Sequence, residues 1–142
     1  MDEWSSLRGL VALPRGRLVR GRRLADPATA ADFAVILGNG PVPRWDYRRV
    51  HWADFWVPRD RADALDALRE AHARAYQGQR VEVACRGGVG RTGTALAALA
   101  VLDGLPPAQA LAWVRRHYHR HAVETPWQRR WLLQLEGGGS GA

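Results

Sequence analysis

The segment from Arg80 to Leu102 constrains the fold most strongly. It begins with a short run rich in β-branched residues, Arg80 to Ala84, and continues through a glycine-rich stretch. A run of Ala, Leu and Val from Thr94 to Leu102 follows and ends before Gly104. These patterns predict a short strand, a tight loop and a fully buried helix. A strand, loop and helix in immediate succession are typical of an α/β fold.

The rest of the chain supplies elements that extend this unit. Four strand candidates precede it: Leu10 to Leu13, Leu18 to Val19, Phe33 to Leu37 and Arg48 to Trp52. Asp60 is placed to cap a helix that ends near Gly78, and Pro106 and Pro107 fit the opening turn of a helix that runs to about Tyr118. Thr125 to Gln128 forms a capping box for a last helix. We expect one α/β domain over residues 1–136, followed by a flexible glycine-rich tail at 137–142.

The glycine-rich loop after the predicted strand has the chemistry of a phosphate site. Its closely spaced glycines allow successive backbone N–H groups to point inward, and the following helix contributes its positive end. These groups and Arg91 would favour the thiolate of Cys85, at the start of the loop, as a nucleophile. The planar fork of Arg91 suits two phosphoryl oxygens, and the Thr92 hydroxyl can donate to the sulfur. We assign phosphate binding to Arg86, Gly87, Gly88, Val89, Gly90 and Arg91.

Composition narrows the classes of function. The net charge is +7, and every basic residue is Arg, which favours an anionic partner. Because the chain has no Lys, it lacks the Gly-Lys-Ser/Thr motif of a nucleotide-binding phosphate loop. Its single cysteine excludes an intrachain disulfide framework and suits a reducing cytoplasm. No stretch has the roughly 20 apolar residues of a membrane span, and no secretion signal is evident.

Three motifs resemble those of the cysteine-dependent protein tyrosine phosphatases. Cys85 to Thr92 resembles the signature loop of that superfamily, Trp52 to Pro58 its movable acid loop, and Glu124 to Gln128 its glutamine loop. The resemblance implies a central, mixed and largely parallel sheet flanked by helices. It also implies a metal-free, cofactor-free reaction in which Cys85 attacks phosphorus, Arg91 binds the phosphoryl group and Asp54 is the acid and base. Thr92 would help the sulfur leave, and Gln128 would orient the hydrolytic water.

This sequence departs from the family pattern in ways that leave the substrate open. Ala84 stands where the family usually has histidine, and Ala53 and Trp56 replace Pro and Gly of the acid loop. The size is closer to a dual-specificity domain than to a large tyrosine-specific one. We expect a phosphorylated protein as substrate, with a phosphoinositide or RNA 5′-phosphate, or a catalytically weak phosphate-binding module, as alternatives. No obligatory nucleic acid is expected. The alternate histidines around the end of the third helix are expected to be solvated rather than metal ligands: His117, His119 and His121.

Overall fold

The computed structural model describes Trp4 and residues 8–136, so the predicted tail at 137–142 lies outside the described residues. The sheet has the order β1-β2-β5-β3-β4. Its strands are β1 (Leu10–Ala12), β2 (Leu18–Arg23), β3 (Phe33–Leu37), β4 (Tyr47–Val50) and β5 (Val81–Cys85). Only β1 pairs antiparallel in this sheet, and the other pairs are parallel. The mixed, largely parallel sheet implied by the resemblance is therefore confirmed.

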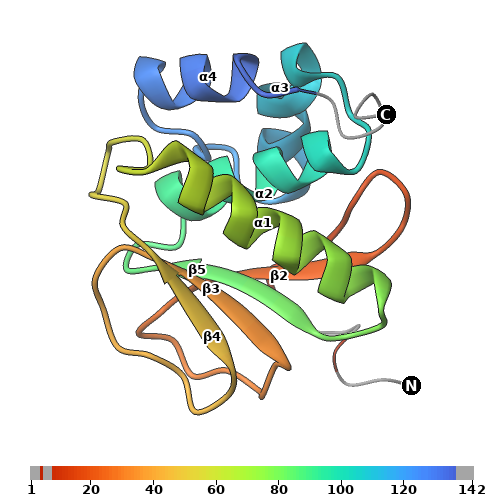
Figure 1. Ribbon diagram of the computed structural model, residues 1–142, viewed down its shortest axis with the longest axis vertical. Helices are drawn as coiled ribbons and strands as arrows, with labels where there is room; N and C mark the ends of the chain where they lie inside the picture. Colours follow the sequence, from red (N-terminus) through yellow and green to blue (C-terminus); the bar gives the residue numbers. More distant parts are fainter. Residues whose placement is uncertain (1–3, 5–7, 137–142) are drawn as a thin grey trace.

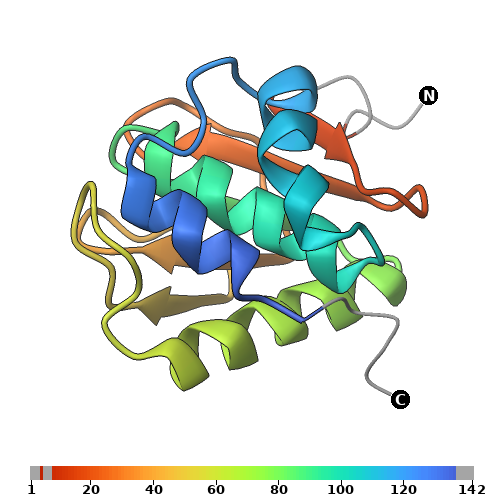
Figure 2. The same cartoon turned by 90° about the horizontal axis from the view of Figure 1, so that it is seen from above.

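The described residues form four α-helices, which lie on one side of the sheet, as Figures 1 and 2 show: α1 (Arg61–Tyr76), α2 (Gly90–Leu102), α3 (Pro107–His117) and α4 (Pro126–Leu133). Alternate residues of β3 and β5, such as Val35 and Val83, belong to the same core cluster as the helices. Helix α2 lies beneath α3 and α4, and its residues from Gly90 to Val101 are all buried. None of the helices within the described residues is long and apolar enough to span a membrane.

In the part of the chain that the structure describes, loops rather than α-helices lie over the opposite face of the sheet, at the bottom of Figure 1. Ala34 and Ile36 of β3 and Ala84 of β5 pack there against Leu24. The buried carboxylate of Glu82 also lies on this face and accepts hydrogen bonds from Arg20, Arg22 and Trp45. Two guanidinium groups and an indole N–H compensate the cost of burying this charge.

The helix ends follow from local sequence. The Asp60 side chain accepts a hydrogen bond from the Asp63 backbone N–H and caps α1. Helix α4 has the predicted capping box, in which the side chains of Thr125 and Gln128 each accept a backbone N–H. Helix α2 begins at Gly90 rather than at the predicted Thr94, so Arg91 and Thr92 lie in its first turn. Strand β4 ends at Val50, two residues before the predicted Trp52.

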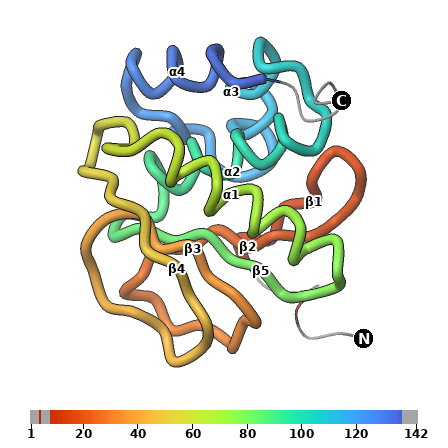
Figure 3. The backbone as a smooth tube through the Cα atoms, viewed as in Figure 1, coloured from red at the N-terminus to blue at the C-terminus, as the bar shows by residue number. Residues whose placement is uncertain are grey.

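The topology brings three chain segments together at one edge of the sheet. Strands β3, β4 and β5 are parallel, so the segments that follow Leu37, Val50 and Cys85 leave from the same edge, as the left side of Figure 3 shows. In open α/β sheets the carboxyl ends of the strands are where ligands bind. The predicted signature loop and acid loop both lie at this edge.

Candidate active site

Cys85 is the last residue of β5, and its side chain is buried at the start of the glycine-rich loop. Its Sγ accepts hydrogen bonds from the Gly88 backbone N–H at 3.1 Å and from the Thr92 hydroxyl at 3.0 Å. Helix α2 begins five residues after Cys85, so its N-terminal end lies in the same loop. Hydrogen-bond donors and the positive end of a helix interact favourably with negative charge on the sulfur, which suits a nucleophile.

The loop itself is fixed by Gly88. This residue has φ of +69°, a conformation that glycine adopts at little cost, and a Cβ there would lie 2.7 Å from the backbone nitrogen of Arg23. The Tyr118 hydroxyl donates to the Gly88 carbonyl at 2.5 Å. Burial, with a smaller contribution from the charge of Cys85, raises the pKa of this tyrosine, so the hydroxyl stays protonated and keeps donating.

Arg91 joins the signature loop to the other two segments. Its guanidinium is buried, and Nη1 donates to the carbonyls of Leu37 at 3.3 Å and of Trp52 at 2.9 Å. Among the residues that the structure describes, none accepts a hydrogen bond from Nε of Arg91. A buried N–H without an acceptor is costly, and a phosphoryl oxygen would satisfy it.

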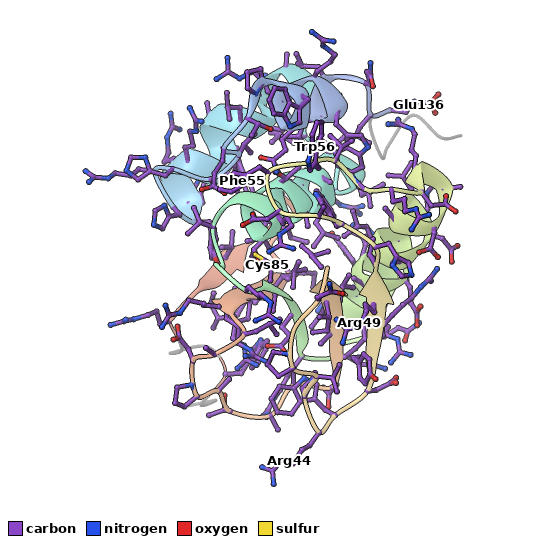
Figure 4. All side chains as sticks on the ribbon, turned by 90° about the vertical axis from the view of Figure 1, so that its left-hand side faces the viewer. Arg44, Arg49, Phe55, Trp56, Cys85 and Glu136 are labelled. Atoms are coloured by element: carbon purple, nitrogen blue, oxygen red, sulfur yellow. The ribbon has the colours of Figure 1, made fainter. Side chains whose placement is uncertain are left out.

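Asp54 lies on the predicted acid loop, between β4 and α1. Its Oδ1 accepts a hydrogen bond from the Phe55 backbone N–H at 3.0 Å and lies 3.6 Å from Nε of Arg91. The side chain is 56% exposed, so it can exchange protons with solvent. In the view of Figure 4, Phe55 and Trp56 of this loop lie above Cys85.

A cavity of about 690 Å³ opens between the acid loop and the signature loop. Asp54, Arg86 and Arg91 line it, and Trp56 and Arg59 contribute further along the acid loop. Asp54 is the one acidic residue among the lining residues described, so the cavity is basic. The loop residues Gly87, Gly88 and Val89 instead line a second cavity of about 710 Å³, which shares no lining residue with the first.

Gln128 is fully buried, and both ends of its amide have protein partners. Its Oε1 accepts from the backbone N–H groups of Glu124 and Thr125, and Nε2 donates to the Trp56 carbonyl at 3.0 Å. The structure therefore brings Gln128 to the acid loop, where it contacts backbone. The predicted role in orienting water stays a prediction.

Glu124 is a carboxylate near the site that the sequence reasoning did not single out. Its side chain packs directly over Gly90, where even a Cβ would overlap its carboxylate. Burial, and then the charge of Asp54, raise the pKa of Glu124, whereas Arg91 opposes the shift. The sequence signal was its place as the first residue of the motif that ends at Gln128.

His117 is the last residue of α3, and the two histidines that follow it do not gather around a common centre with carboxylates. The rings of His119 and His121 lie 5.6 Å apart, and the backbone N–H of His121 donates to Nδ1 of His119. Within the part of the chain that the structure describes, no group of three or more His, Cys, Asp and Glu residues could hold a metal ion.

Comparison with known proteins gives a family profile and several structures. The profile described as protein-tyrosine phosphatase matches residues 42–126. Tk-PTP in its active form has a TM-score of 0.70 and 27% sequence identity, over 89% of this chain and 95% of that chain. Kinase associated phosphatase (KAP), with its catalytic-site cysteine substituted by serine, has a TM-score of 0.69 and 16% sequence identity, over 87% of this chain and 90% of that chain. PTPMT1 has a TM-score of 0.62 and 18% sequence identity, over 73% of this chain and 74% of that chain.

Among curated proteins, no sequence matches this chain significantly. The two structures below 25% identity show similarity of fold. The region matched by the family profile contains Asp54, Cys85, Arg91 and Thr92, and ends at Pro126, just before Trp127 and Gln128.

Proposed function

Because this chain belongs to the protein-tyrosine phosphatase family and is a cysteine-dependent phosphatase, we propose that it hydrolyses phosphotyrosine in proteins through a phosphorylated Cys85. The observation that carries this proposal is the pair of donors on Sγ of Cys85, the Gly88 N–H and the Thr92 hydroxyl. A sulfur with two donors, at the start of a loop that also carries a buried guanidinium whose Nε–H has no hydrogen-bond acceptor among the described residues, is suited to attack on a bound phosphoryl group.

In the first step, the Cys85 thiolate attacks phosphorus and the bond from phosphorus to the tyrosine oxygen breaks. Arg91 and the N–H groups of residues 86–91 bind the phosphoryl oxygens, where negative charge is held during transfer. Protonated Asp54 gives its proton to the leaving phenoxide, which departs as tyrosine. The products of this step are the dephosphorylated protein and a cysteinyl-phosphate.

In the second step, Asp54 is the base. It takes a proton from water, whose oxygen attacks phosphorus while the bond from sulfur to phosphorus breaks. Inorganic phosphate leaves, and the Thr92 hydroxyl stabilises the returning thiolate. Gln128 is proposed to orient this water, a role that requires its amide to exchange at least one of its present partners.

The basic cavity also suits substrates other than phosphotyrosine. Arg59 and Arg86 line it, and no ion-pair partner for either is found among the described residues. Phosphoserine and phosphothreonine, as in a dual-specificity enzyme, and phosphoinositides or RNA 5′-phosphates are therefore the competing substrates. We place the reaction in the cytoplasm, because a reducing compartment keeps the Cys85 thiol from oxidation.

A substrate panel assayed with a chelator tests this proposal. The panel contains phosphotyrosine, phosphoserine and phosphothreonine peptides, a phosphoinositide and an RNA 5′-phosphate. We expect the highest kcat/KM for phosphotyrosine peptides and a severe loss of kcat in Arg91→Lys, which keeps the charge but not the planar fork. A higher kcat/KM for the lipid or the RNA would overturn the assignment of phosphotyrosine as the substrate. Binding without turnover of any substrate would indicate a phosphate-binding module.

A further inference from the structure

The acid loop has few backbone hydrogen bonds of its own. The Trp56 N–H donates to the Ala53 carbonyl, and the Arg59 N–H donates to the His51 carbonyl at the base of the loop. Phe55 has φ of +66°, a left-handed conformation that is unfavourable for an aromatic residue. Phe55 and Trp56 are more than half exposed. A loop of this kind depends on side chains from elsewhere for its position.

Three side-chain N–H groups hold the loop, one from Trp52 at its start and two from α4, and all three donate to the carbonyls of Phe55 and Trp56. The Trp56 carbonyl accepts from Trp52 Nε1 at 2.6 Å and from Gln128 Nε2 at 3.0 Å. The Phe55 carbonyl accepts from Trp127 Nε1. Trp127 and Gln128 both belong to α4, which is more than 70 residues away along the chain.

Trp127 makes a second contact with the same loop. Its ring stacks on that of Trp56, with centroids 5.4 Å apart and planes at 28°. Stacked aromatic pairs add interaction free energy beyond that of the apolar area they bury. Trp127 is held in turn by the first turn of α4, where Pro126 and the capping box around Thr125 fix the backbone. One side chain therefore holds both a carbonyl and a ring of the acid loop.

These contacts bear directly on the acid. Phe55 follows Asp54, and its own N–H is the hydrogen-bond donor to the Asp54 carboxylate. Movement of the Phe55 peptide would therefore carry Asp54 away from Arg91, which it approaches within 3.6 Å. We propose that Trp127 is a positioning residue that holds the acid loop, and with it Asp54, at the active site before substrate binds. This inference rests on the proposed role of Asp54 as the acid.

Two substitutions separate the two contacts of Trp127. Trp127→Phe removes the indole N–H and keeps an aromatic ring on Trp56, whereas Trp127→Ala removes both. The matched control is Trp113→Phe, because Trp113 packs on the core from α3 and its ring contacts His117, away from the acid loop. Thermal unfolding of each variant establishes that it is folded at the assay temperature.

The measurement is the rate of the phosphorylation step, taken from stopped-flow bursts with two substrates. A phosphotyrosine peptide has a leaving phenol with pKa near ~10 and needs the acid, whereas an activated aryl phosphate does not. We expect Trp127→Ala to slow the peptide by on the order of 100-fold, the loss that a misplacement of about 1 Å produces. Trp127→Phe should slow the peptide by a smaller factor. Both Trp127 variants should cleave the aryl phosphate at the same rate as the control Trp113→Phe.

Asp54→Asn in the same assay distinguishes failure of the positioning role of Trp127 from failure of the role of Asp54 as the acid. Asp54→Asn should also slow the phosphorylation step selectively with the peptide, and by a larger factor than Trp127→Ala. If Trp127→Ala slows both substrates equally while Asp54→Asn remains selective, Trp127 does not position the acid and the proposed function stands. If Asp54→Asn also slows both equally, the assignment of Asp54 as the acid fails, and the role of Trp127 fails with it.

Discussion

The hydroxyl oxygen of Thr92 lies 3.0 Å from Sγ of Cys85, and both side chains are buried. Thr92 reaches this position because α2 begins two residues before it, so its side chain points from the first helical turn toward the end of β5. The hydroxyl can thus stabilise the sulfur as a leaving group in the second step.

Thr92→Val keeps the shape of the side chain and removes the hydroxyl. A hydrogen bond to a charged group contributes about 1.5 to 3 kcal/mol, so breakdown of the cysteinyl-phosphate should slow by about 10- to 100-fold. Rapid-quench assays should show the phosphoenzyme accumulating while the initial burst persists. Thr92→Ser, which retains a hydroxyl, is the control. Unchanged steady-state turnover in Thr92→Val would show that the hydroxyl does not assist this step.

Gly38, directly after β3, gives a test of the Arg91 geometry. It has φ of +82°, and a Cβ there would overlap Nη1 of Arg91 and the Trp52 carbonyl. Gly78 has φ of +86° with open space around it, so Gly78→Ala measures the backbone cost alone, about 1 to 2 kcal/mol. Gly38→Ala should lose more free energy of unfolding and also most of its kcat. Equal losses in the two variants, with full activity, would show that the Arg91 position is not critical.

The raised pKa of Glu124 predicts how its substitution affects stability. Because burial and the charge of Asp54 raise this pKa above 4.5, ionisation of Glu124 is less favourable in the folded protein than in the unfolded chain. The stabilising contribution of protonated Glu124 is fully present below the pKa that Glu124 has in the unfolded chain. It is lost as the pH rises through the pKa that Glu124 has in the folded protein. Glu124→Gln should therefore be more stable than the wild type at pH 7.

Denaturant unfolding at several pH values checks this expectation. The advantage of Glu124→Gln should shrink as pH falls through the folded pKa and disappear below about pH 4, near the unfolded pKa of glutamate. Glu136→Gln is the matched control, because the side chains of Glu124 and Glu136 are both largely exposed. A variant that is less stable than the wild type at pH 7 would mean that the ionised carboxylate is stabilised, contrary to the direction of its pKa.

Arg59 predicts a preference among phosphotyrosine peptides. It lines the same cavity as Asp54 and Arg91, so acidic residues beside the phosphotyrosine should lower KM. Arg59→Gln should raise KM for acidic peptides by a few-fold, consistent with about 1 kcal/mol for an exposed ion pair, and leave neutral peptides unchanged. Arg44→Gln is the control, because Arg44 lies far from Cys85 in Figure 4. An equal change in KM for both peptides would contradict this preference.

The strand, loop and helix around Cys85 could be predicted because their signals are local. The β-branched run and the apolar helix are continuous in sequence, and Gly88 occupies a position that requires positive φ. The start of α2 was predicted four residues late, because glycine disfavours helix interiors and the segment 90–93 contains two of them. Tertiary contacts prevail there, since Gly90 and Gly93 pack too closely against Glu124 and Ala122 for larger residues.

The contacts that complete the site could not be predicted in the same way. The sequence indicated Asp54 and Gln128 as parts of separate motifs, and the capping box of Gln128 is a local pattern. The hydrogen bond from Gln128 to the Trp56 carbonyl, and that from Trp127 to Phe55, each join residues 72 positions apart. They depend on how α4 packs over the acid loop, which no local spacing encodes.

The most direct test is the capture of the covalent intermediate. Wild-type protein mixed with a phosphotyrosine peptide, quenched within the burst and digested, should carry one phosphoryl group on the peptide that contains Cys85. The Cys85→Ser variant should bind the same substrate without turnover, because the signature loop binds the phosphoryl group independently of the sulfur. Turnover in Cys85→Ser, or wild-type turnover with no phosphoryl group on Cys85 at any quench time, would contradict the account.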